Sequence, residues 1–394
     1  MDLDRNFQYI RTKDSQLPTN PVVHLKMKVT VVTGTRPQII KSAPLLHEME
    51  KRGIEVTFVN TGQHYDYELA EQFIEELQIK EPDYNLEVGS GTGVYQTTEI
   101  LKRLSDVPAL STSDYLIVPG DTNSALGAAL TGFKMEIPTC HLESGLRSFD
   151  MIMQEEINRR LIDHGCAALF APTDTAVKNL KDENVRGDIF QVGDTMYDIL
   201  KEKLKDFTDE SFQNSILEEL GIKEDKFAVL TLHRKENVDV PSRIKGILEG
   251  LSRLDFTIIL PIHPRTKQRL TDMNLHLSDN IITTSPIPYV KMMSLVSKST
   301  LLMTDSGGLQ KEAYLLNTPC VTIRDNSEWI ETIEAGANVL AAADPSDIVE
   351  KVNRMWDKRL SNNPAVYGDG NASKKITDVL LKGEIKIKNH VMLS

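Results

Sequence analysis

Three side chains that can transfer protons follow short β-branched runs in this chain. Asp121, Glu143 and His233 each come just after such a run. In doubly wound α/β domains, ligands bind beyond the carboxyl ends of the strands, so side chains placed there can reach them. The placement predicts a site for general acid–base chemistry. For Asp121 alone, the alternative is a cap on the next helix, a role that aspartate fills readily.

A third carboxylate, Glu155, belongs to a stretch with the pattern of a helix start. Spacings of three and four residues put Glu155, Asn158 and Arg159 on one helical face, from which they can project together toward a ligand. Alternatively, Glu155 and Glu156 only complement the positive end of the helix dipole. The residues themselves leave both interpretations open.

Two loops have the composition of anion-binding sites. The sequence Gly-Thr-Arg-Pro at 34–37, followed by Lys41, combines free N–H groups at a helix start with cationic side chains. The sequence Ser-Gly-Gly at 306–308 opens another helix, in which Glu312 can accept both hydroxyls of a ribose. The second loop favours a nucleoside diphosphate, whereas the first is equally consistent with a plain turn. Neither a Walker lysine pattern nor a Gly-x-Gly-x-x-Gly loop is present, so neither a P-loop NTPase nor a dinucleotide site is predicted.

The second half of the chain twice places a histidine and an arginine directly after a strand. These pairs are His233 with Arg234 and His263 with Arg265. A lone histidine is more often structural, but two in matching positions favour a functional role. No two histidines share a metal-ligand spacing such as i, i+4, so no metal site is predicted.

An alternation of short strands and longer amphipathic stretches must position these residues. Helical patterns at 39–51 and 68–77 lie between the first strands. Such β-α-β-α order predicts parallel sheets with helices on both faces. The predicted strands are 28–33, 55–60, 115–118, 138–141, 168–170, 189–192, 227–232, 257–262, 280–283, 301–304 and 320–323.

We therefore predict the α/β class, with two Rossmann-like doubly wound domains and a cleft between them. The length of 394 residues suits two domains, since a domain typically has roughly 100–200 residues. The predicted divisions are a loose N-terminal extension at 1–26, an N-terminal domain at 27–200, a charged connecting segment at 201–225, a C-terminal nucleotide-binding domain at 226–380 and a tail at 381–394.

Composition excludes several classes of protein. The formal net charge is −12, from 45 Lys and Arg against 57 Asp and Glu, which disfavours broad binding to nucleic acid or anionic lipid. No segment has the ~18 consecutive apolar residues that span a bilayer, and no signal-peptide pattern begins the chain. Three cysteines lie far apart without a Cys-x-x-Cys pair, which indicates a reducing, cytoplasmic compartment.

Several segments of the chain match, in order, the motifs of a known family. They are 34–37 with Lys41, 120–122, 143–147, 155–159, 233–234, 304–310 and 324–325. Over about residues 27–380, the chain thereby resembles the non-hydrolysing UDP-N-acetylglucosamine (UDP-GlcNAc) 2-epimerases. The resemblance implies a GT-B-like fold, with UDP held mainly by the C-terminal domain and the sugar facing both domains.

The resemblance also implies the reaction. The C2 proton is removed and UDP is expelled, which leaves 2-acetamidoglucal; UDP then adds back while a proton returns to the opposite face of C2. Two acid–base groups that flank the sugar fit this inversion, because one side chain cannot easily serve both faces. No NAD, metal or other cofactor is implied.

Carried over position by position, the resemblance implies three sets of site residues. The catalytic set is Asp121, Glu143, Glu155 and His233. The substrate-binding set is Arg36, Lys41, Arg147, Asn158, Arg159, His263, Ser306, Gly307, Gly308, Glu312 and Arg324. Gln63 and Arg234 match an activating second UDP-GlcNAc site, although Asp66 departs from the pattern of that site and weakens the expectation of activation.

Several positions depart from the commonest pattern of the family. They include Gln38, Gln154 and Lys311, and the segment 324–331 differs from the Thr-Glu-Arg-Pro-Glu ending of the UDP-GlcNAc enzymes. That segment is more similar to the Thr-Glu-Trp-Val-Glu of relatives that epimerise UDP-2,3-diacetamido-2,3-dideoxyglucuronate. The alternative is neutral drift at sites away from the sugar. Because the first half of the chain carries no separate sign of a uronate pocket, UDP-GlcNAc is the first expectation.

Three further functions stand as alternatives. A GT-B glycosyltransferase needs an acceptor site, whereas the clustered carboxylates favour elimination. A hydrolysing epimerase usually precedes a kinase domain, and we expect no such module here. A silent nucleotide-sugar binding module does not need all four catalytic candidates. The expected partners are a UDP-sugar and a second copy of the chain in a homodimer, with no nucleic acid and no membrane.

Overall fold

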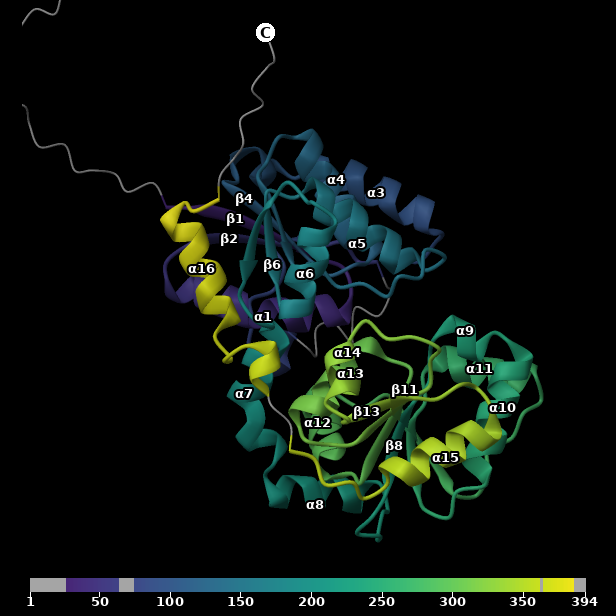
Figure 1. The fold of residues 1–394 in the computed structure, drawn as a ribbon. Coiled ribbons are helices and arrows are strands. Elements are labelled where there is room, and N and C mark those ends of the chain that lie inside the picture. Colours follow the sequence, from purple (N-terminus) through teal and green to yellow (C-terminus); the bar gives the residue numbers. More distant parts are fainter. Residues whose placement is uncertain (1–25, 64–73, 362–363, 386–394) are drawn as a thin grey trace, which may run out of the picture.

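The protein folds around two parallel β-sheets, which form the two lobes seen in Figure 1. The structure is a computed structural model that describes residues 26–63, 74–361 and 364–385. The predicted α/β class with two Rossmann-like domains is confirmed. Within the described ranges, no helix has both the length and the apolar character needed to cross a membrane.

Seven parallel strands form the N-terminal sheet, in the order β3-β2-β1-β4-β5-β6-β7. The chain moves outward from β1 to β3 and then returns to β4 beside β1. A topological switch point therefore lies between β1 and β4, where ligands bind in such sheets. The strands are β1 (Lys28–Thr33), β2 (Glu55–Asn60), β3 (Tyr84–Asn85), β4 (Tyr115–Pro119), β5 (Thr139–Leu142), β6 (Ala168–Ala171) and β7 (Asp188–Gln191).

The C-terminal sheet has six parallel strands in the order β10-β9-β8-β11-β12-β13, which repeats the topology of the first sheet. Its switch point lies between β8 and β11, where Thr231 pairs with Thr304 at the strand ends. The strands are β8 (Ala228–Thr231), β9 (Ile258–Pro261), β10 (Ile281–Thr284), β11 (Leu301–Thr304), β12 (Cys320–Thr322) and β13 (Asn338–Leu340).

Helices cover both faces of the sheets, so the middle strands are buried and their Val, Ile and Leu runs need no polar side. The helices of the N-terminal lobe are α1 (Arg36–Lys51), α3 (Gly93–Ser105), α4 (Asn123–Lys134), α5 (Gln154–Gly165) and α6 (Asp174–Asp182), with a short 3₁₀ helix at Pro108–Thr112. Those of the C-terminal lobe are α9 (Lys235–Val238), α10 (Pro241–Ser252), α11 (Pro264–Asp272), α12 (Tyr289–Lys298), α13 (Gly307–Leu315), α14 (Ile330–Glu334) and α15 (Pro345–Met355).

The predicted strands agree with the structure to within one residue at each end. Two strands, β3 and β13, were not predicted, because runs of two and three residues carry too little periodicity to be recognised. The predicted helix at 39–51 is α1, which begins three residues earlier at Arg36. Most of the predicted helix at 68–77 and of the N-terminal extension lies outside the described residues, as does most of the C-terminal tail.

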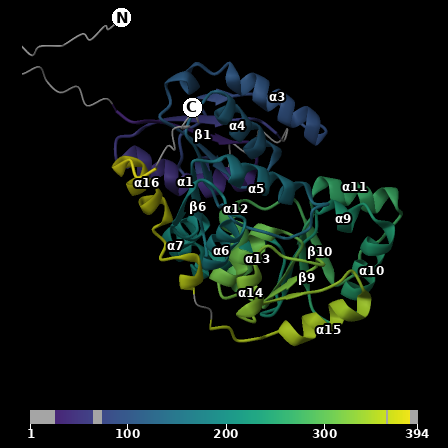
Figure 2. The same ribbon diagram turned by 45° about the horizontal axis from the view of Figure 1, so that its top comes forward.

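Three helices join the two lobes. Helices α7 (Thr195–Phe207) and α8 (Glu210–Glu219) lie largely in the charged segment, and their apolar faces pack into one core with residues of both lobes. After a short 3₁₀ helix at Pro364–Tyr367, helix α16 (Ala372–Lys382) returns to the N-terminal lobe and lies along α1 (Figures 1 and 2). An ion pair between Arg52 and Asp378 fastens this end of the chain.

We expect the packing of α16 on α1 to contribute measurably to stability. Leu380 is completely buried, so Leu380→Ala should lower the free energy of unfolding by about 2–5 kcal/mol. The neighbouring Leu381 is 44% exposed, and Leu381→Ala is the matched control, with an effect within about 0.5 kcal/mol. Urea unfolding followed by circular dichroism measures both, and equal losses in the two variants would contradict the packing.

Candidate active site

Asp121 follows strand β4, at the switch point of the N-terminal sheet. Thr122 rather than Asp121 caps helix α4, because its hydroxyl accepts the N–H of Ala125. The Asp121 carboxylate instead pairs with Arg159, whose Nε and Nη2 lie 2.9 and 2.8 Å from Oδ2. Its side chain remains 29% exposed. The capping alternative is therefore wrong, and this carboxylate is accessible beyond the strand end.

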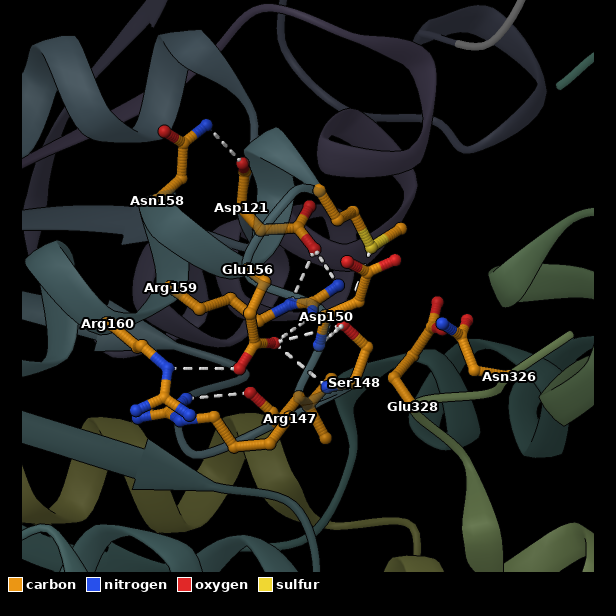
Figure 3. Close-up of polar contacts among 12 residues, drawn as sticks. Asp121, Arg147, Ser148, Asp150, Glu156, Asn158, Arg159, Arg160, Asn326 and Glu328 are labelled. Atoms are coloured by element: carbon orange, nitrogen blue, oxygen red, sulfur yellow. Dashed lines mark hydrogen bonds and ion pairs between the residues drawn. The ribbon is translucent and has the colours of Figure 1, made fainter. Parts of the chain in front are cut away.

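Helix α5 supplies the partners of Asp121. Asn158 donates from Nδ2 to the backbone oxygen of Asp121 at 2.8 Å, while Arg159 binds the carboxylate (Figure 3). Burial lowers the pKa of Arg159, but the charges of Asp121, Glu328 and Glu156 outweigh it and raise the pKa. Of the three α5 residues expected to share one helical face, Asn158 and Arg159 both contact Asp121.

The two adjacent glutamates of α5 have different surroundings. Glu156 is completely buried and accepts hydrogen bonds from the N–H of Ser148 at 2.8 Å and from Arg159 at 2.9 Å. Glu155 is partly exposed. Burial lowers the pKa of Arg234, but nearby carboxylates that include Glu155 outweigh it. Glu156 therefore braces the helix start, whereas Glu155 lies near an arginine of the other lobe.

Glu143 follows strand β5 and is held by two lysines. Its backbone has a φ of +68°, a left-handed conformation that is costly for a non-glycine residue and typical of functional sites. Lys41 pairs with Oε2, and Lys311 donates to Oε1 at 3.0 Å. Burial raises the pKa of this carboxyl, but the two lysine charges outweigh burial and lower its pKa to about 2. Glu143 is therefore an anion in this structure.

Lys311 is a site residue that the sequence did not predict. It lies on α13 of the C-terminal lobe, yet its completely buried ammonium pairs with both Glu143 and Asp194. The ring of Trp329 lies 4.2 Å from the ammonium. Burial lowers the pKa of Lys311, but the two carboxylates raise it further and keep the side chain charged. The sequence marked Lys311 as a departure from the family pattern, but gave no sign that its ammonium meets Glu143 and Asp194.

Glu328 is a second residue that the sequence did not place in the site. Arg324 donates to its Oε2 at 2.8 Å. The loop that carries Glu328 faces Asp121 and Arg159 (Figure 3). Burial raises the pKa of Glu328, but Arg324, Arg159 and Arg234 outweigh it and lower the pKa to about 2. A Cβ atom at Gly307 would lie only 2.1 Å from Oε1, so this carboxylate rests against the first turn of α13. The arginines near the first turn of α13 therefore stabilise a negative charge at that place.

The histidine after β8 is oriented by a buried aspartate. The Nδ1 atom of His233 lies 3.2 Å from Asp305, which also accepts the backbone N–H groups of His233 and Arg234 at 3.0 and 2.9 Å. The His233 side chain is 43% exposed. His263 caps α11 by accepting the N–H of Arg265. Both histidines thus lie at strand ends of the C-terminal lobe, as the sequence predicted.

The glycine-rich start of α13 is built for close approach. Gly308 has open space where a Cβ would stand, and Ser306 does not use its side chain as a cap. One turn later, Glu312 is buried beside the hydroxyl of Tyr289. Burial raises the pKa of Glu312, although positive charges that include Arg36 lower it in part. The residues predicted for a nucleoside diphosphate therefore share one short region with Arg36 of the other lobe.

Two predicted ligand residues are instead engaged inside the N-terminal lobe. The guanidinium of Arg147 is completely buried and pairs with Asp163 at 2.8 Å and Glu183 at 2.7 Å. The side-chain oxygen of Gln63 accepts the N–H and hydroxyl of Ser124 at 3.0 and 2.7 Å. In this arrangement Arg147 and Gln63 support the loops around the site and do not join the cluster at Asp121.

Gln38 shows why one departure from the family pattern suits this chain. Its amide donates from Nε2 to the backbone oxygen of Pro119 at 2.7 Å and accepts the N–H of Gly34 at 2.9 Å. The side chain is almost fully buried. An ionised glutamate could accept the second bond but could not donate the first. Gln38 thus ties the loop after β1 to the end of β4, across the switch point.

No cluster of three or more His, Cys, Asp or Glu side chains suited to hold a metal ion occurs in the parts of the chain that the structure describes. The charged groups at the domain boundary are instead carboxylates paired with lysine and arginine. Such a set can bind anionic groups through its cations and can exchange protons through its carboxylates.

The chain is similar to proteins that are named as 2-epimerases of UDP-sugars. The family model described as UDP-N-acetylglucosamine 2-epimerase matches residues 47–381. A protein of Methanococcus maripaludis, named UDP-N-acetylglucosamine 2-epimerase homolog, is 42% identical over 358 residues, which cover 90% of this chain and 99% of that protein. The crystal structure of Methanocaldococcus jannaschii UDP-GlcNAc 2-epimerase in complex with UDP-GlcNAc and UDP has a TM-score of 0.85 and 39% identity, and covers 91% of this chain and 100% of that chain.

A further relative differs in its named substrate. It is the UDP-2,3-diacetamido-2,3-dideoxy-D-glucuronate 2-epimerase of Pseudomonas aeruginosa, which is 38% identical over 364 residues. These residues cover 90% of this chain and 100% of that protein.

The role of Gln38 can be tested by an almost isosteric change. Gln38→Glu removes the donor to Pro119 and buries an anion against a carbonyl oxygen, so the free energy of unfolding at pH 7 should fall by about 1–3 kcal/mol. Gln154→Glu makes the same chemical change at an exposed position in the first turn of α5, where a negative charge is neutral or stabilising. Chemical unfolding of both variants gives the comparison, and an unaffected Gln38→Glu would refute the bond.

The pKa of Glu328 predicts how stability depends on acidity. Because its folded pKa is lowered from 4.5 to about 2, the ionised carboxylate stabilises the fold above its unfolded pKa, and this stability is lost as the pH falls toward 2. Glu328→Gln should therefore flatten the dependence of the unfolding free energy on pH between pH 5 and 3, by up to about 1.4 kcal/mol per pH unit. Urea unfolding at several pH values measures the slope, and parallel curves for wild type and variant would contradict this assignment.

Proposed function

This chain belongs to the UDP-N-acetylglucosamine 2-epimerase family, and on that basis we propose that it interconverts UDP-GlcNAc and UDP-ManNAc. The observation that carries the proposal is the cluster of proton-transfer groups at the domain boundary. Asp121 and Glu143 lie at neighbouring strand ends, and Glu155 lies on the helix that contacts Asp121. The proposed route eliminates UDP and adds it back, so it moves only a proton and the leaving group and needs no redox cofactor.

The proposed chemistry has two steps. A carboxylate takes the proton from C2 while the bond from C1 to the UDP oxygen breaks, and the products are 2-acetamidoglucal and UDP. UDP then adds again at C1, and an acid on the opposite side returns a proton to C2. Asp121, Glu143, Glu155 and His233 are the proposed acid–base groups, because they are the proton-transfer side chains that the family motifs place here.

The binding groups are assigned by charge and backbone geometry. We place the diphosphate at the start of α13, where the two glycines present backbone N–H groups and Arg324 adds a positive charge. Lys41, Arg159 and Asn158 contribute from the N-terminal lobe, close to the sugar. Glu312 and His263 are proposed to contact the nucleoside, as the family motifs imply.

Epimerisation of UDP-2,3-diacetamido-2,3-dideoxyglucuronate is the second candidate. The observation that favours it is the similarity of the 324–331 segment to relatives that use this sugar, together with the Pseudomonas aeruginosa relative at 38% identity. UDP-GlcNAc remains the first candidate, because the family model and several relatives of about 40% identity carry the name UDP-N-acetylglucosamine 2-epimerase.

Several features of the biological unit belong to the same proposal. We propose a homodimer, which the family resemblance implies. We also propose a cytoplasmic location, since the three free cysteines are buried and unpaired, as suits a reducing compartment. Light scattering measures the dimer directly. Activation by a second UDP-GlcNAc is not proposed. Gln63 is hydrogen-bonded to Ser124, and the charge of Arg234 interacts with the carboxylates of Glu328 and Glu155.

Incubation with UDP-GlcNAc in deuterated water tests the reaction. NMR should show deuterium at C2 and a mixture of UDP-GlcNAc and UDP-ManNAc. Net release of UDP would indicate hydrolysis or transfer, and no exchange would contradict the proposal. Exchange on the diacetamido uronate in place of UDP-GlcNAc would move the substrate assignment to the second candidate.

Single substitutions test the acid–base groups. Asp121→Asn, Glu143→Gln and Glu155→Gln should each lower kcat by about 10²–10⁴, because each removes a proton-transfer group, while calorimetry shows that UDP still binds. Glu156→Gln is the matched control beside Glu155: it changes a buried brace, so it should lower the melting temperature, whereas Glu155→Gln should not. Near-normal turnover in all three carboxylate variants would refute the assignment.

A further inference from the structure

Helix α13 connects two features of the proposed active site. Its first turn carries the glycines proposed to bind the diphosphate. One turn later, the side chain of Lys311 extends to the N-terminal lobe. There it pairs with Glu143 and Asp194. The nucleotide site and the environment of one proposed acid–base group thus share a single nine-residue helix.

Lys311 is placed as a fixed charge and not as a substrate ligand. The side chain is completely buried, and an isolated buried ammonium would be very costly. Glu143 and Asp194 provide its ion pairs, and the ring of Trp329 covers it at 4.2 Å. These contacts leave no direction from which a sugar could reach the ammonium.

The two oxygens of Glu143 each have their own cation. Lys41 of α1 holds Oε2 and Lys311 of α13 holds Oε1. An adjacent positive charge favours the ionised form of a carboxyl and makes it a weaker base. A general base works best when its pKa lies near the working pH, so two lysines hold Glu143 far below that optimum. Asp194 competes with Glu143 for the ammonium of Lys311 and moderates its effect.

We propose that Lys311 is a positioning residue that sets the basicity and the orientation of Glu143 in the epimerisation. The proposal rests on the function inferred above. Lys311 holds Oε1 from the nucleotide-binding lobe, and Lys41 holds Oε2 from the sugar side, so the carboxylate cannot rotate about its last bond. Because Lys311 and the diphosphate site lie on one helix, the placement of Glu143 depends on how that helix sits against the N-terminal lobe.

The pH dependence of kcat/KM for UDP-GlcNAc tests this role. The limb of this profile that reports Glu143 is the pH range in which kcat/KM changes as Glu143 titrates. Lys311→Met removes one cation, so this limb should move upward by about 1–3 units from a wild-type position near pH 2. Although Glu143 becomes a stronger base, the loss of its fixed orientation should lower kcat, and this fall should exceed any change in KM because no substrate contact is lost. Lys311→Arg keeps the charge and should leave the limb near its wild-type position.

A matched variant separates positioning from mere structural support. Asp194→Asn removes the other partner of Lys311 but leaves the cation on Glu143, so it should lower the melting temperature without moving the limb upward. If Lys311→Met does not fold, the double variant with Asp194→Asn removes the buried cation and its second carboxylate together, and it should show the same upward shift.

Two outcomes would overturn the inference. One is an unmoved limb in the folded Lys311→Met protein or in the double variant. The other is an equal upward shift in Asp194→Asn. Failure of the proposed function is recognised separately, because the wild-type protein would then show no deuterium exchange at C2 of UDP-GlcNAc.

Discussion

A connected set of ion pairs across the boundary between the two lobes organises the candidate site. Lys41 and Lys311 share the carboxylate of Glu143, and Lys311 is also held by Asp194. Each of these charged groups would be costly to bury alone. This set of ion pairs is therefore stable only when both lobes are in place. The strained left-handed backbone at Glu143 persists because both carboxylate oxygens are held. The same contacts that join the lobes therefore shape the proposed acid–base group.

A second group of charges, around Glu328, bears on how an acidic protein could bind the proposed diphosphate. The net charge of −12 describes the whole molecule, but Arg159, Arg234 and Arg324 are gathered around a single carboxylate, Glu328. That carboxylate lies against the first turn of α13, where the diphosphate is proposed to bind. Local charge, and not the overall excess of acidic residues, therefore determines which ligand this boundary favours.

Most of the fold could be predicted because its signals are local. The β-branched runs mark strands to within one residue, and the loops after β4 and β5 carried Asp121 and Glu143 to the expected sheet edge. Strands β3 and β13 were missed because they are too short to show a period. For Asp121 both a cap and a functional role were open, and the structure gives the cap of α4 to Thr122. The face shared by Asn158 and Arg159 followed from helical spacing alone.

The sequence by itself determined the class of fold, the strand ends that carry the carboxylates and, through its motifs, the family. Only the tertiary structure decided which charges meet. Lys41 and Glu143 are 102 residues apart, and Lys311 is 168 residues from Glu143, so no local pattern links them. The tertiary structure also decided that Glu156 is buried while Glu155 is partly exposed, and that Arg147 is buried in an ion pair with Asp163. The physical reason is that strands and turns follow from neighbouring residues, whereas an ion pair depends on how two lobes pack and on which of its groups are withdrawn from water.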